Sequence, residues 1–257
     1  MNEILKIEKL SKYFGGVKAV HNFNLSLQEG KIHGLIGPNG AGKTTIFNLI
    51  TGIYKPMDGN IIFCNQDITG KKPYSIARLG IGRTFQNIKL FANLTALQNV
   101  IIAGNQDITY NLLESFLRTV KFRKEEKSLR EKAMMLLETV GLADMADKMA
   151  SNLPYGHQRK LEIARALALN PRLLLLDEPA AGMNTEESKE LVTFIYDIKE
   201  RFNLTILIIE HHMDVISNLC DECTVLNFGE TICRGCPSTV KRDRLVIEAY
   251  LGEEYVC

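Results

Sequence analysis

The chain has 257 residues, and its 31 Lys and Arg against 30 Asp and Glu give a formal net charge of +1 at pH 7. A global charge this close to zero provides no strong field that would select nucleic acid or an anionic membrane. No apolar run approaches the roughly 18 residues of a membrane span, and the start, MNEILKIEKL, lacks the apolar stretch of a signal peptide. We therefore expect a cytoplasmic protein without bound nucleic acid, in one large domain or one domain with an insertion.

The first 30 residues favour antiparallel β-structure. Apolar and polar side chains alternate over residues 23–27, which is the period of a half-buried strand. Tyr13 and Phe14 directly precede two glycines. An aromatic residue at such a strand end could stack on a base, but the residues alone favour an ordinary core aromatic.

Residues 37–45, GPNGAGKTT, match the phosphate-binding pattern G-x-x-x-x-G-K-[ST]. Glycines let backbone N–H groups point at one anion, and the start of a helix adds its positive end. Lys43 would meet the outer phosphates, and the Thr44 hydroxyl would ligate Mg²⁺. An apolar strand before the loop and helical spacing after it supply the required context. The predicted nucleotide contacts are Gly37, Pro38, Asn39, Gly40, Ala41, Gly42, Lys43, Thr44 and Thr45.

The middle of the chain is predicted to be mainly helical, starting near Leu94. It contains a basic run at residues 121–127, in which lysines and arginine mix with glutamates, and this favours a solvated helix face. Gly141 ends that helix. A new helix opens in LPYGHQRK, residues 153–160, and ends at Asn170-Pro171.

Two short apolar runs predict buried strands of a parallel sheet. The first, residues 173–176, consists of four leucines and is followed by Asp177 and Glu178. The second, residues 205–209, is followed by Glu210 and two histidines, one of which we expect at the ligand edge of the sheet and the other at the surface. Polar groups at this end of the strands lie where open α/β sheets bind ligands. Asp177 is therefore predicted to hold Mg²⁺ and Glu178 to polarise a water.

Four cysteines form two C-x-x-C pairs, Cys220 with Cys223 and Cys233 with Cys236. A hairpin between the pairs could bring Cys223 near Cys233, so a zinc site is one possibility. We favour reduced thiols, because a core of this size needs no metal staple.

Taken together, the phosphate loop, Gln86, LPYGHQ, LLLLDEP and His211 resemble the ATP-binding subunits of ABC transporters over essentially the whole chain. Within that family the chain is similar to the LivG-type branched-chain amino acid transport ATPases, on the stretches GIGRTFQNIKLFANLTALQNV, LDEPAAGMN, IEHHMDV and AYLGEE.

The resemblance implies an α/β fold: a RecA-like P-loop NTPase core with an N-terminal antiparallel β subdomain and an inserted helical subdomain. The single ABC ATPase domain, residues 1–257, would then divide into core segments 1–87 and 161–237, a helical subdomain 88–160 with the signature loop, and a C-terminal helical extension 238–257.

The resemblance also assigns catalytic roles. Gln86 would touch Mg²⁺ and the attacking water and signal to the membrane partner. Asp177 would bind Mg²⁺, Glu178 would be the general base, and His211 would contact the γ-phosphate. Phe14 matches the aromatic that stacks on adenine, with Tyr13 as the alternative.

The signature loop implied by the resemblance would act on the ATP of the opposite subunit, and residues 181–184 would form the subunit contact. One departure from the family pattern is Pro154, where a serine hydroxyl usually reaches the γ-phosphate. Tyr155 likewise replaces the usual glycine. The loop consists of Leu153, Pro154, Tyr155, Gly156, His157 and Gln158.

The implied cofactors are ATP and Mg²⁺. The implied partners are a second ABC ATPase subunit, identical or different, integral membrane permease subunits, and an extracytoplasmic solute-binding protein. The chain would then lie on the inner face of the cell membrane. Urea, other amino acids and lipopolysaccharide export stay open as alternative cargoes, and a P-loop kinase or non-transport ATPase as more distant alternatives.

Overall fold

The computed structural model describes residues 2–251 and separates into two compact units, Met1–Gln86 with Arg172–Cys257, and Asn87–Pro171. The second unit ends later than the predicted subdomain boundary at residue 160. The reason is helix α6 (Tyr155–Leu167), which continues without interruption through that position and packs on other helices of the second unit. Among the described residues, no helix is both long and apolar enough to cross a membrane.

The first unit contains a four-stranded antiparallel sheet, ordered β2-β1-β4-β5. Leu5 pairs with Leu27 and Ile7 with Leu25 across its two long strands, and all four side chains are buried. This confirms the antiparallel structure predicted for the first 30 residues. The strands are β1 (Glu3–Phe14), β2 (Val17–Gln28), β4 (Asp58–Phe63) and β5 (Gln66–Asp67).

The second sheet of this unit has six strands in the order β10-β9-β3-β8-β7-β6. All are parallel to their neighbours except the edge strand β10. Every residue of β3, β7 and β8 is buried, as expected when both faces of a parallel sheet are covered. The strands are β3 (Ile32–Ile36), β6 (Ile81–Arg83), β7 (Leu173–Asp177), β8 (Thr205–Ile209), β9 (Glu222–Asn227) and β10 (Glu230–Gly235).

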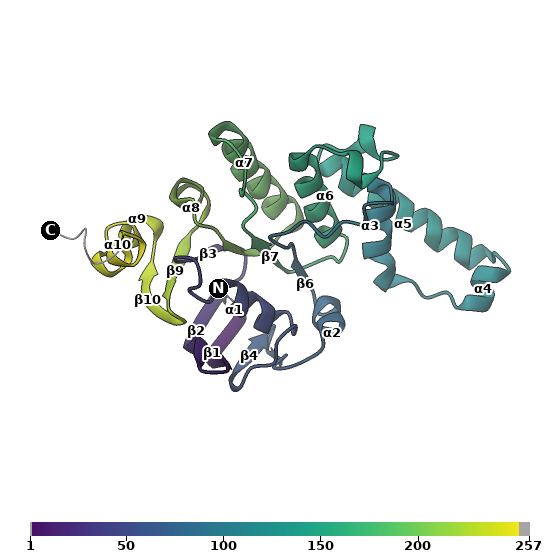
Figure 1. The fold of residues 1–257 in the computed structure, drawn as a ribbon. Helices are drawn as coiled ribbons and strands as arrows, with labels where there is room; N and C mark the ends of the chain where they lie inside the picture. Colours follow the sequence, from purple (N-terminus) through teal and green to yellow (C-terminus); the bar gives the residue numbers. More distant parts are fainter. Residues whose placement is uncertain (1, 252–257) are drawn as a thin grey trace. The chain divides into compact units, whose positions relative to one another are not determined.

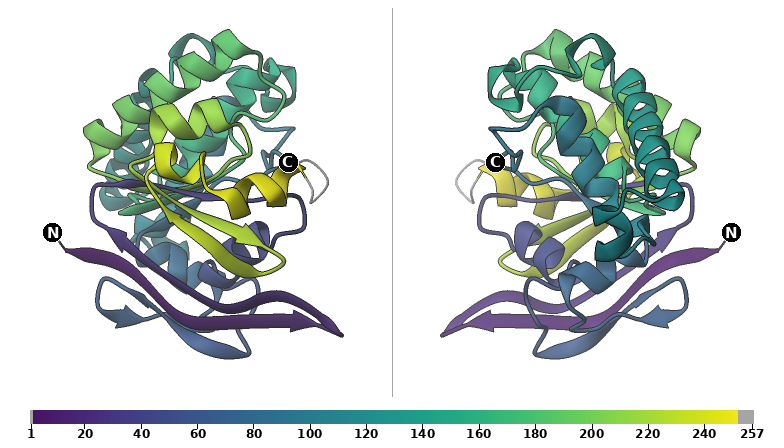
Figure 2. Two further views of the ribbon diagram at one scale, coloured as in Figure 1. Left: turned by 90° about the vertical axis from the view of Figure 1, so that its left-hand side faces the viewer. Right: turned by 90° about the vertical axis from the view of Figure 1, so that its right-hand side faces the viewer.

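Helices connect strands of the first unit and continue the chain after β10. Helix α1 follows the phosphate loop (Figure 1). Its Phe47 is fully buried in a core to which both sheets contribute. Helix α7 begins with a capping box, in which Asn184 and Glu187 exchange hydrogen bonds. The helices are α1 (Lys43–Ile50), α2 (Pro73–Arg78), α7 (Thr185–Phe202), α8 (Met213–Leu219), α9 (Pro237–Val240) and α10 (Arg244–Leu251). Figure 2 shows α9 and α10 beside the hairpin of β9 and β10.

The second unit is helical, as predicted, and is built around α3, α5 and α6. A capping box between Thr95 and Gln98 starts α3, and Leu136 and Leu137 of α5 are buried in the helical core. The elements are α3 (Ala96–Gly104), α4 (Leu112–Phe116), α5 (Val120–Thr139), α6, and the short 3-10 turns η1 (Asn105–Asp107), η2 (Ala143–Met145) and η3 (Ala150–Asn152).

Candidate functional site

The phosphate loop joins β3 to α1 by a backbone path that only glycine can follow at two positions. Gly37 and Gly42 have φ angles of 147° and 104°. A Cβ at Gly37 would lie 2.1 Å from the carbonyl oxygen of Leu226, and one at Gly42 would lie 2.3 Å from that of Ala19. Gly42 also caps α1, so the free N–H groups of the first helical turn face the loop.

Lys43 is folded back over the loop. Its Nζ donates hydrogen bonds to the carbonyl oxygens of Gly37 at 2.7 Å and Pro38 at 2.9 Å. Burial lowers the pKa of the Lys43 ammonium, while the carboxylates of Glu178 and Asp177 act in the opposite direction. The lysine therefore shares one electrostatic environment with the acidic residues at the end of β7.

A pocket of about 530 Å³ lies over the phosphate loop. Residues 39–45 form its floor, so most of the predicted phosphate contacts line one cavity. Gln86 and Glu178 line it from the ends of β6 and β7. Its remaining walls are Val17, Lys18, Ala19 and Phe228.

The three predicted catalytic residues meet beside this pocket. Gln86 Nε2 donates a hydrogen bond of 2.9 Å to Glu178 Oε2, and His211 Nδ1 lies 4.0 Å from the same oxygen. They come from segments far apart in the chain, after β6, β7 and β8. Parallel strands end at a common edge, and this brings the three side chains together.

Glu178 has a left-handed backbone with a φ of 47°, which is strained for a residue with a side chain. Its N–H donates a 2.9 Å hydrogen bond to the carbonyl oxygen of Ile209, the residue that pairs with Asp177 in the sheet. That bond holds the turn in place, so the sheet itself sets the direction of the Glu178 side chain.

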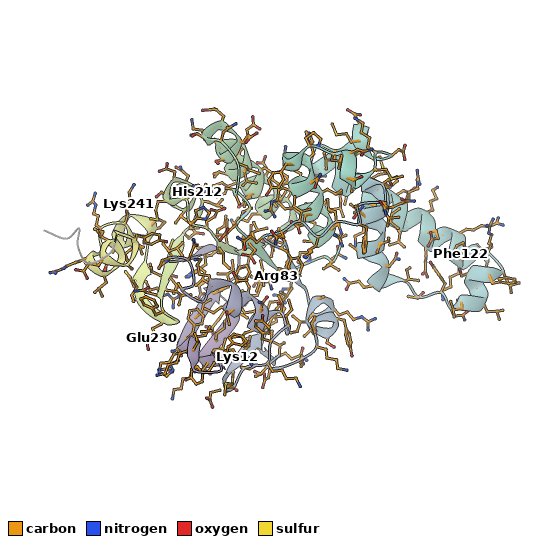
Figure 3. The ribbon with its side chains drawn as sticks, in the orientation of Figure 1. Lys12, Arg83, Phe122, His212, Glu230 and Lys241 are labelled. Atoms are coloured by element: carbon orange, nitrogen blue, oxygen red, sulfur yellow. The ribbon has the colours of Figure 1, made fainter. Side chains whose placement is uncertain are left out.

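Asp177 ends β7 with a side chain that is only 2% exposed. Its Oδ2 accepts a hydrogen bond of 3.0 Å from Arg83 Nη2. Arg83 Nη1 also donates to Asn48 Oδ1 at 2.7 Å and to Thr51 Oγ1 at 3.1 Å, both from the helix of the phosphate loop and its cap. The side chain of Arg83, labelled in Figure 3, is only 6% exposed.

Arg83 was not among the predicted site residues. It stands in GIGRTFQ, where a charged residue within a short apolar strand was the available signal. Charges inside strands of a covered sheet are seldom tolerated without a partner, so an acidic partner could have been expected.

Glu210 is a second residue that the sequence did not single out. Its side chain accepts hydrogen bonds from the N–H groups of Ala180 at 2.8 Å and His211 at 3.2 Å. Burial raises the pKa of this carboxyl group, and these N–H donors oppose the shift. Glu210 thus links the turn after β7 to the turn after β8 and positions His211.

The two neighbouring histidines differ in their surroundings. His211 Nδ1 lies 4.0 Å from Glu178 Oε2, whereas His212 occupies the N-cap position of α8 without a side-chain capping hydrogen bond. Their rings are 4.2 Å apart. Together with Glu210 they form the one group, among residues 2–251, in which three potential metal-ligating side chains bring their ligand atoms within 4.8 Å of one another.

Tyr13 and Phe14, the two candidates for stacking on a base, differ in their contacts. Tyr13 Oη shares a 2.8 Å hydrogen bond with His21 Nδ1. Phe14 is 43% exposed and contacts Tyr54 edge to face, with the ring centroids 5.2 Å apart. Phe14 is thus partly exposed, with Lys12 Nζ over its ring at 5.4 Å from the centroid, and it does not line the pocket over the phosphate loop.

The predicted signature loop lies in the second unit, at the start of α6. Pro154 is the N-cap of this helix, with a φ of −54°. Gln158 Nε2 donates to the carbonyl oxygen of Leu153 at 2.8 Å, and Arg159 Nη2 donates to Tyr155 Oη at 3.0 Å. Gly156 is exposed, and a Cβ there would meet no atom within 4 Å. Hydrogen bonds within the loop and the first turn of α6 therefore hold its shape, while the backbone at Gly156 stays exposed to solvent.

The cysteine pairs occupy different surroundings. Cys220 and Cys223 are buried, and both sulfurs lie next to Gly34. Cys236 is exposed at the start of α9 and bonds the hydroxyls of Ser238 and Thr239. In the β9–β10 hairpin, Cys223 pairs with Gly235 and Cys233 with Val225. The register therefore does not place Cys223 opposite Cys233.

Comparison with known proteins agrees with this architecture. The ABC transporter family profile matches residues 20–181, and that of the branched-chain amino acid ATP-binding cassette transporter matches residues 230–256. The high-affinity branched-chain amino acid transport ATP-binding protein LivG of Escherichia coli K12 is 43% identical over 97% of this chain and 98% of its own. BraF of Pseudomonas aeruginosa, which carries the same description, is 42% identical with the same coverage.

Solved structures give the same result. A crystal structure of the ADP conformation of MJ1267, an ATP-binding cassette of an ABC transporter, superposes with a TM-score of 0.85 and 35% identity. The match covers 98% of this chain and 100% of that one. The structure of CbiO1 from Clostridium perfringens, part of the ABC transporter complex CbiONQ, has a TM-score of 0.81 and 26% identity over 99% of this chain and 97% of that one. The chain therefore belongs to the ATP-binding ATPase subunits of ABC transporters, in the branched-chain amino acid group.

Proposed function

We propose that this ATPase powers the uptake of branched-chain amino acids through membrane permease subunits. The observation that carries the proposal is the 43% identity to LivG, which extends over 97% of the chain, together with the match of the C-terminal residues to the branched-chain profile. A solute-binding protein outside the membrane would deliver the cargo. The chain itself would lie on the cytoplasmic face of the membrane, held there by the permease.

Hydrolysis would be carried out by the residues around the phosphate loop. The loop N–H groups and Lys43 bind the phosphates. Glu178 takes a proton from the attacking water, which Gln86, hydrogen-bonded to Glu178 at 2.9 Å, helps to orient, and His211 contacts the γ-phosphate. The partly exposed Phe14 ring would stack on the adenine.

Mg²⁺ fits the donors in this site. Thr44, Gln86 and Asp177 offer a hydroxyl, an amide oxygen and a carboxylate, which are the oxygen ligands that Mg²⁺ prefers. Thr44 and Gln86 line the same pocket. When bound, the ion would neutralise charge on the transferred phosphate.

The signature loop would act on the nucleotide of a second ATPase subunit. The accessible backbone at Gly156 and the positive end of α6 are suited to a phosphate. A dimeric form of the cassette MJ0796, which shares the fold at a TM-score of 0.77, shows that this fold can pair with a second copy. We infer a head-to-tail pair with two buried ATP molecules.

The proposal is tested in proteoliposomes that contain the chain with the permease subunits that copurify with it. We expect ATP-dependent uptake of radiolabelled leucine, isoleucine or valine when the matching binding protein is supplied. The Glu178→Gln variant is the control for coupling and should abolish uptake. ATP-dependent uptake of urea or of other amino acids, without uptake of the branched-chain ones, would assign a different cargo.

A further inference from the structure

The second unit carries an apolar surface that the transport cycle described above does not use. We call it the hairpin tip: the short helix α4 and the start of α5, which lie at the end of α5 away from α3 and α6 (Figure 1). Leu112, Phe116 and Val120 are 91%, 85% and 85% exposed, and Leu113 and Leu117 are 66% and 63% exposed. Helix α4 has no buried residue at all. Large exposed apolar patches of this kind mark interaction surfaces.

Contacts within the same segment hold the residues of the hairpin tip and those next to it in place. Tyr110 packs edge to face on Phe122, with the ring centroids 4.9 Å apart. Asn111 and Glu114 form a capping box at the start of α4, and Thr119 caps α5. These contacts hold the hairpin tip in a folded conformation, so the exposure of its apolar side chains is not the result of an unfolded loop.

Three carboxylates in and next to the hairpin tip accept hydrogen bonds from residues of the same segment. Glu125 accepts hydrogen bonds from the Thr109 N–H at 2.9 Å and from its hydroxyl at 2.6 Å. Glu126 accepts from the Tyr110 hydroxyl at 2.6 Å. Glu114 accepts a hydrogen bond from the Asn111 N–H in the capping box.

The cations of the same segment face the solvent. Arg118, Arg123 and Lys124 are exposed beside the apolar residues. No carboxylate in the described part of the chain forms a salt bridge with any of these three. The segment thus combines outward apolar side chains with outward positive charge, although the chain as a whole has a net charge of only +1.

We propose that the hairpin tip inserts its apolar side chains into the interfacial layer of an anionic phospholipid bilayer, with Arg118, Arg123 and Lys124 at the headgroups. Apolar residues flanked by cations are the composition of membrane-surface segments. An anionic leaflet attracts such cations, whereas a purely apolar protein groove would not require them. The contact would be a second attachment, additional to that made through the permease.

The test uses the full-length protein and sedimentation with vesicles that contain no protein. One set is phosphatidylcholine alone, and the other also contains phosphatidylglycerol. We expect binding to the anionic vesicles and its loss at 0.5 M salt, because salt screens surface charges. Replacing the three cations by glutamine should weaken binding by roughly 100-fold, as each contributes about a fivefold effect near such a surface. The double change Leu112→Ser with Phe116→Ser should weaken it at least about tenfold.

The matched control variants remove an exposed aromatic side chain or exposed cations from the first unit, outside the hairpin tip. Tyr74→Ser deletes an aromatic side chain that is 61% exposed on α2, and the triple change Lys189→Gln, Lys241→Gln and Arg242→Gln removes three exposed cations from the first unit. Both controls should bind vesicles like the unchanged protein. All variants should keep the basal ATPase rate, which verifies that they are folded.

Two results would overturn the proposal. One is the absence of binding to anionic vesicles, or equal binding by the tip variants and the unchanged protein. The other is binding only to vesicles that contain permease, reduced by the tip variants, which would make the partner of the hairpin tip a protein. Neither result would affect the proposed function, because transport in proteoliposomes is measured independently.

Discussion

Arg83 Nη2 donates a 3.0 Å hydrogen bond to Asp177 Oδ2, and the two side chains are only 6% and 2% exposed. The pair joins β6, which leads to Gln86, with β7, which leads to Glu178. Since Arg83 also bonds Asn48 in α1, it connects the helix that follows the phosphate loop with the two strands that lead to Gln86 and Glu178. Arg83 is a positioning residue for this site.

Arg83→Met should destabilise the protein by about 3–5 kcal/mol, because it leaves the Asp177 carboxylate buried without its cation. Urea unfolding measures the loss. Lys31→Met is the matched control, since the Lys31–Asp221 pair is 46% and 41% exposed and should contribute no more than about 1 kcal/mol. Equal effects of the two substitutions would mean that Arg83 has no special structural role.

Glu178→Gln should lower ATP turnover by about 10²-fold or more while leaving ATP binding intact. Glutamine keeps the size of the side chain but cannot take a proton from water. Steady-state phosphate release and nucleotide binding are the two measurements. Turnover at the unchanged rate would exclude Glu178 as the general base.

His211→Ala should reduce turnover severely, whereas His212→Ala should have a mild effect. His211 Nδ1 lies 4.0 Å from Glu178 Oε2, while His212 occupies the N-cap position of α8. The two variants are compared by phosphate release under saturating ATP. The opposite order would place the γ-phosphate contact one residue further along the chain.

Pro154→Ser should strengthen ATP-driven dimerisation. Serine adds a hydroxyl for the phosphate, worth about 1.5–3 kcal/mol to a charged group, against about 0.4–1 kcal/mol lost by relaxing the loop. Serine is also a favoured N-cap, so α6 should start normally. Gel filtration with ATP in a Glu178→Gln background gives the dimer fraction, and a weaker dimer would contradict the expectation.

Gly156→Asp should abolish the dimer in the same assay, because its carboxylate would face the γ-phosphate. The exposed position accepts a side chain without a clash, so Gly156→Ala serves as the control for size. A Gly156→Asp protein that still dimerises would show that the signature loop does not contact nucleotide, and the head-to-tail pair would be wrong.

His33 predicts a pH dependence of stability. Burial lowers its pKa to about 4, below the ordinary value of 6.5 in the unfolded chain. The unfolded state therefore binds more protons between these values, and stability is lost as the pH falls from 6.5 towards 4, by about 1.4 kcal/mol per unit. Urea unfolding at pH 7 and pH 5 should show this loss, and His33→Gln should reduce it. Equal pH dependence of both proteins would exclude His33 as the source.

The sequence by itself determined the local parts of the site. The phosphate loop needs glycine where φ is positive and the backbone of Leu226 and Ala19 approaches closely, and such requirements are visible in the order of residues. The buried strands around residues 173–176 and 205–209 were equally visible, because covered parallel strands are apolar on both faces. The strand and helix predictions for these segments are confirmed.

Only the tertiary structure decided which distant groups meet. Arg83 and Asp177 are 94 positions apart, and Glu210 bonds the Ala180 N–H 30 positions away. Likewise, the β9–β10 register decided that Cys233 faces Val225 instead of Cys223. The physical reason is that strand order and register arise from packing of the whole sheet, while a sequence pattern reports only neighbours along the chain.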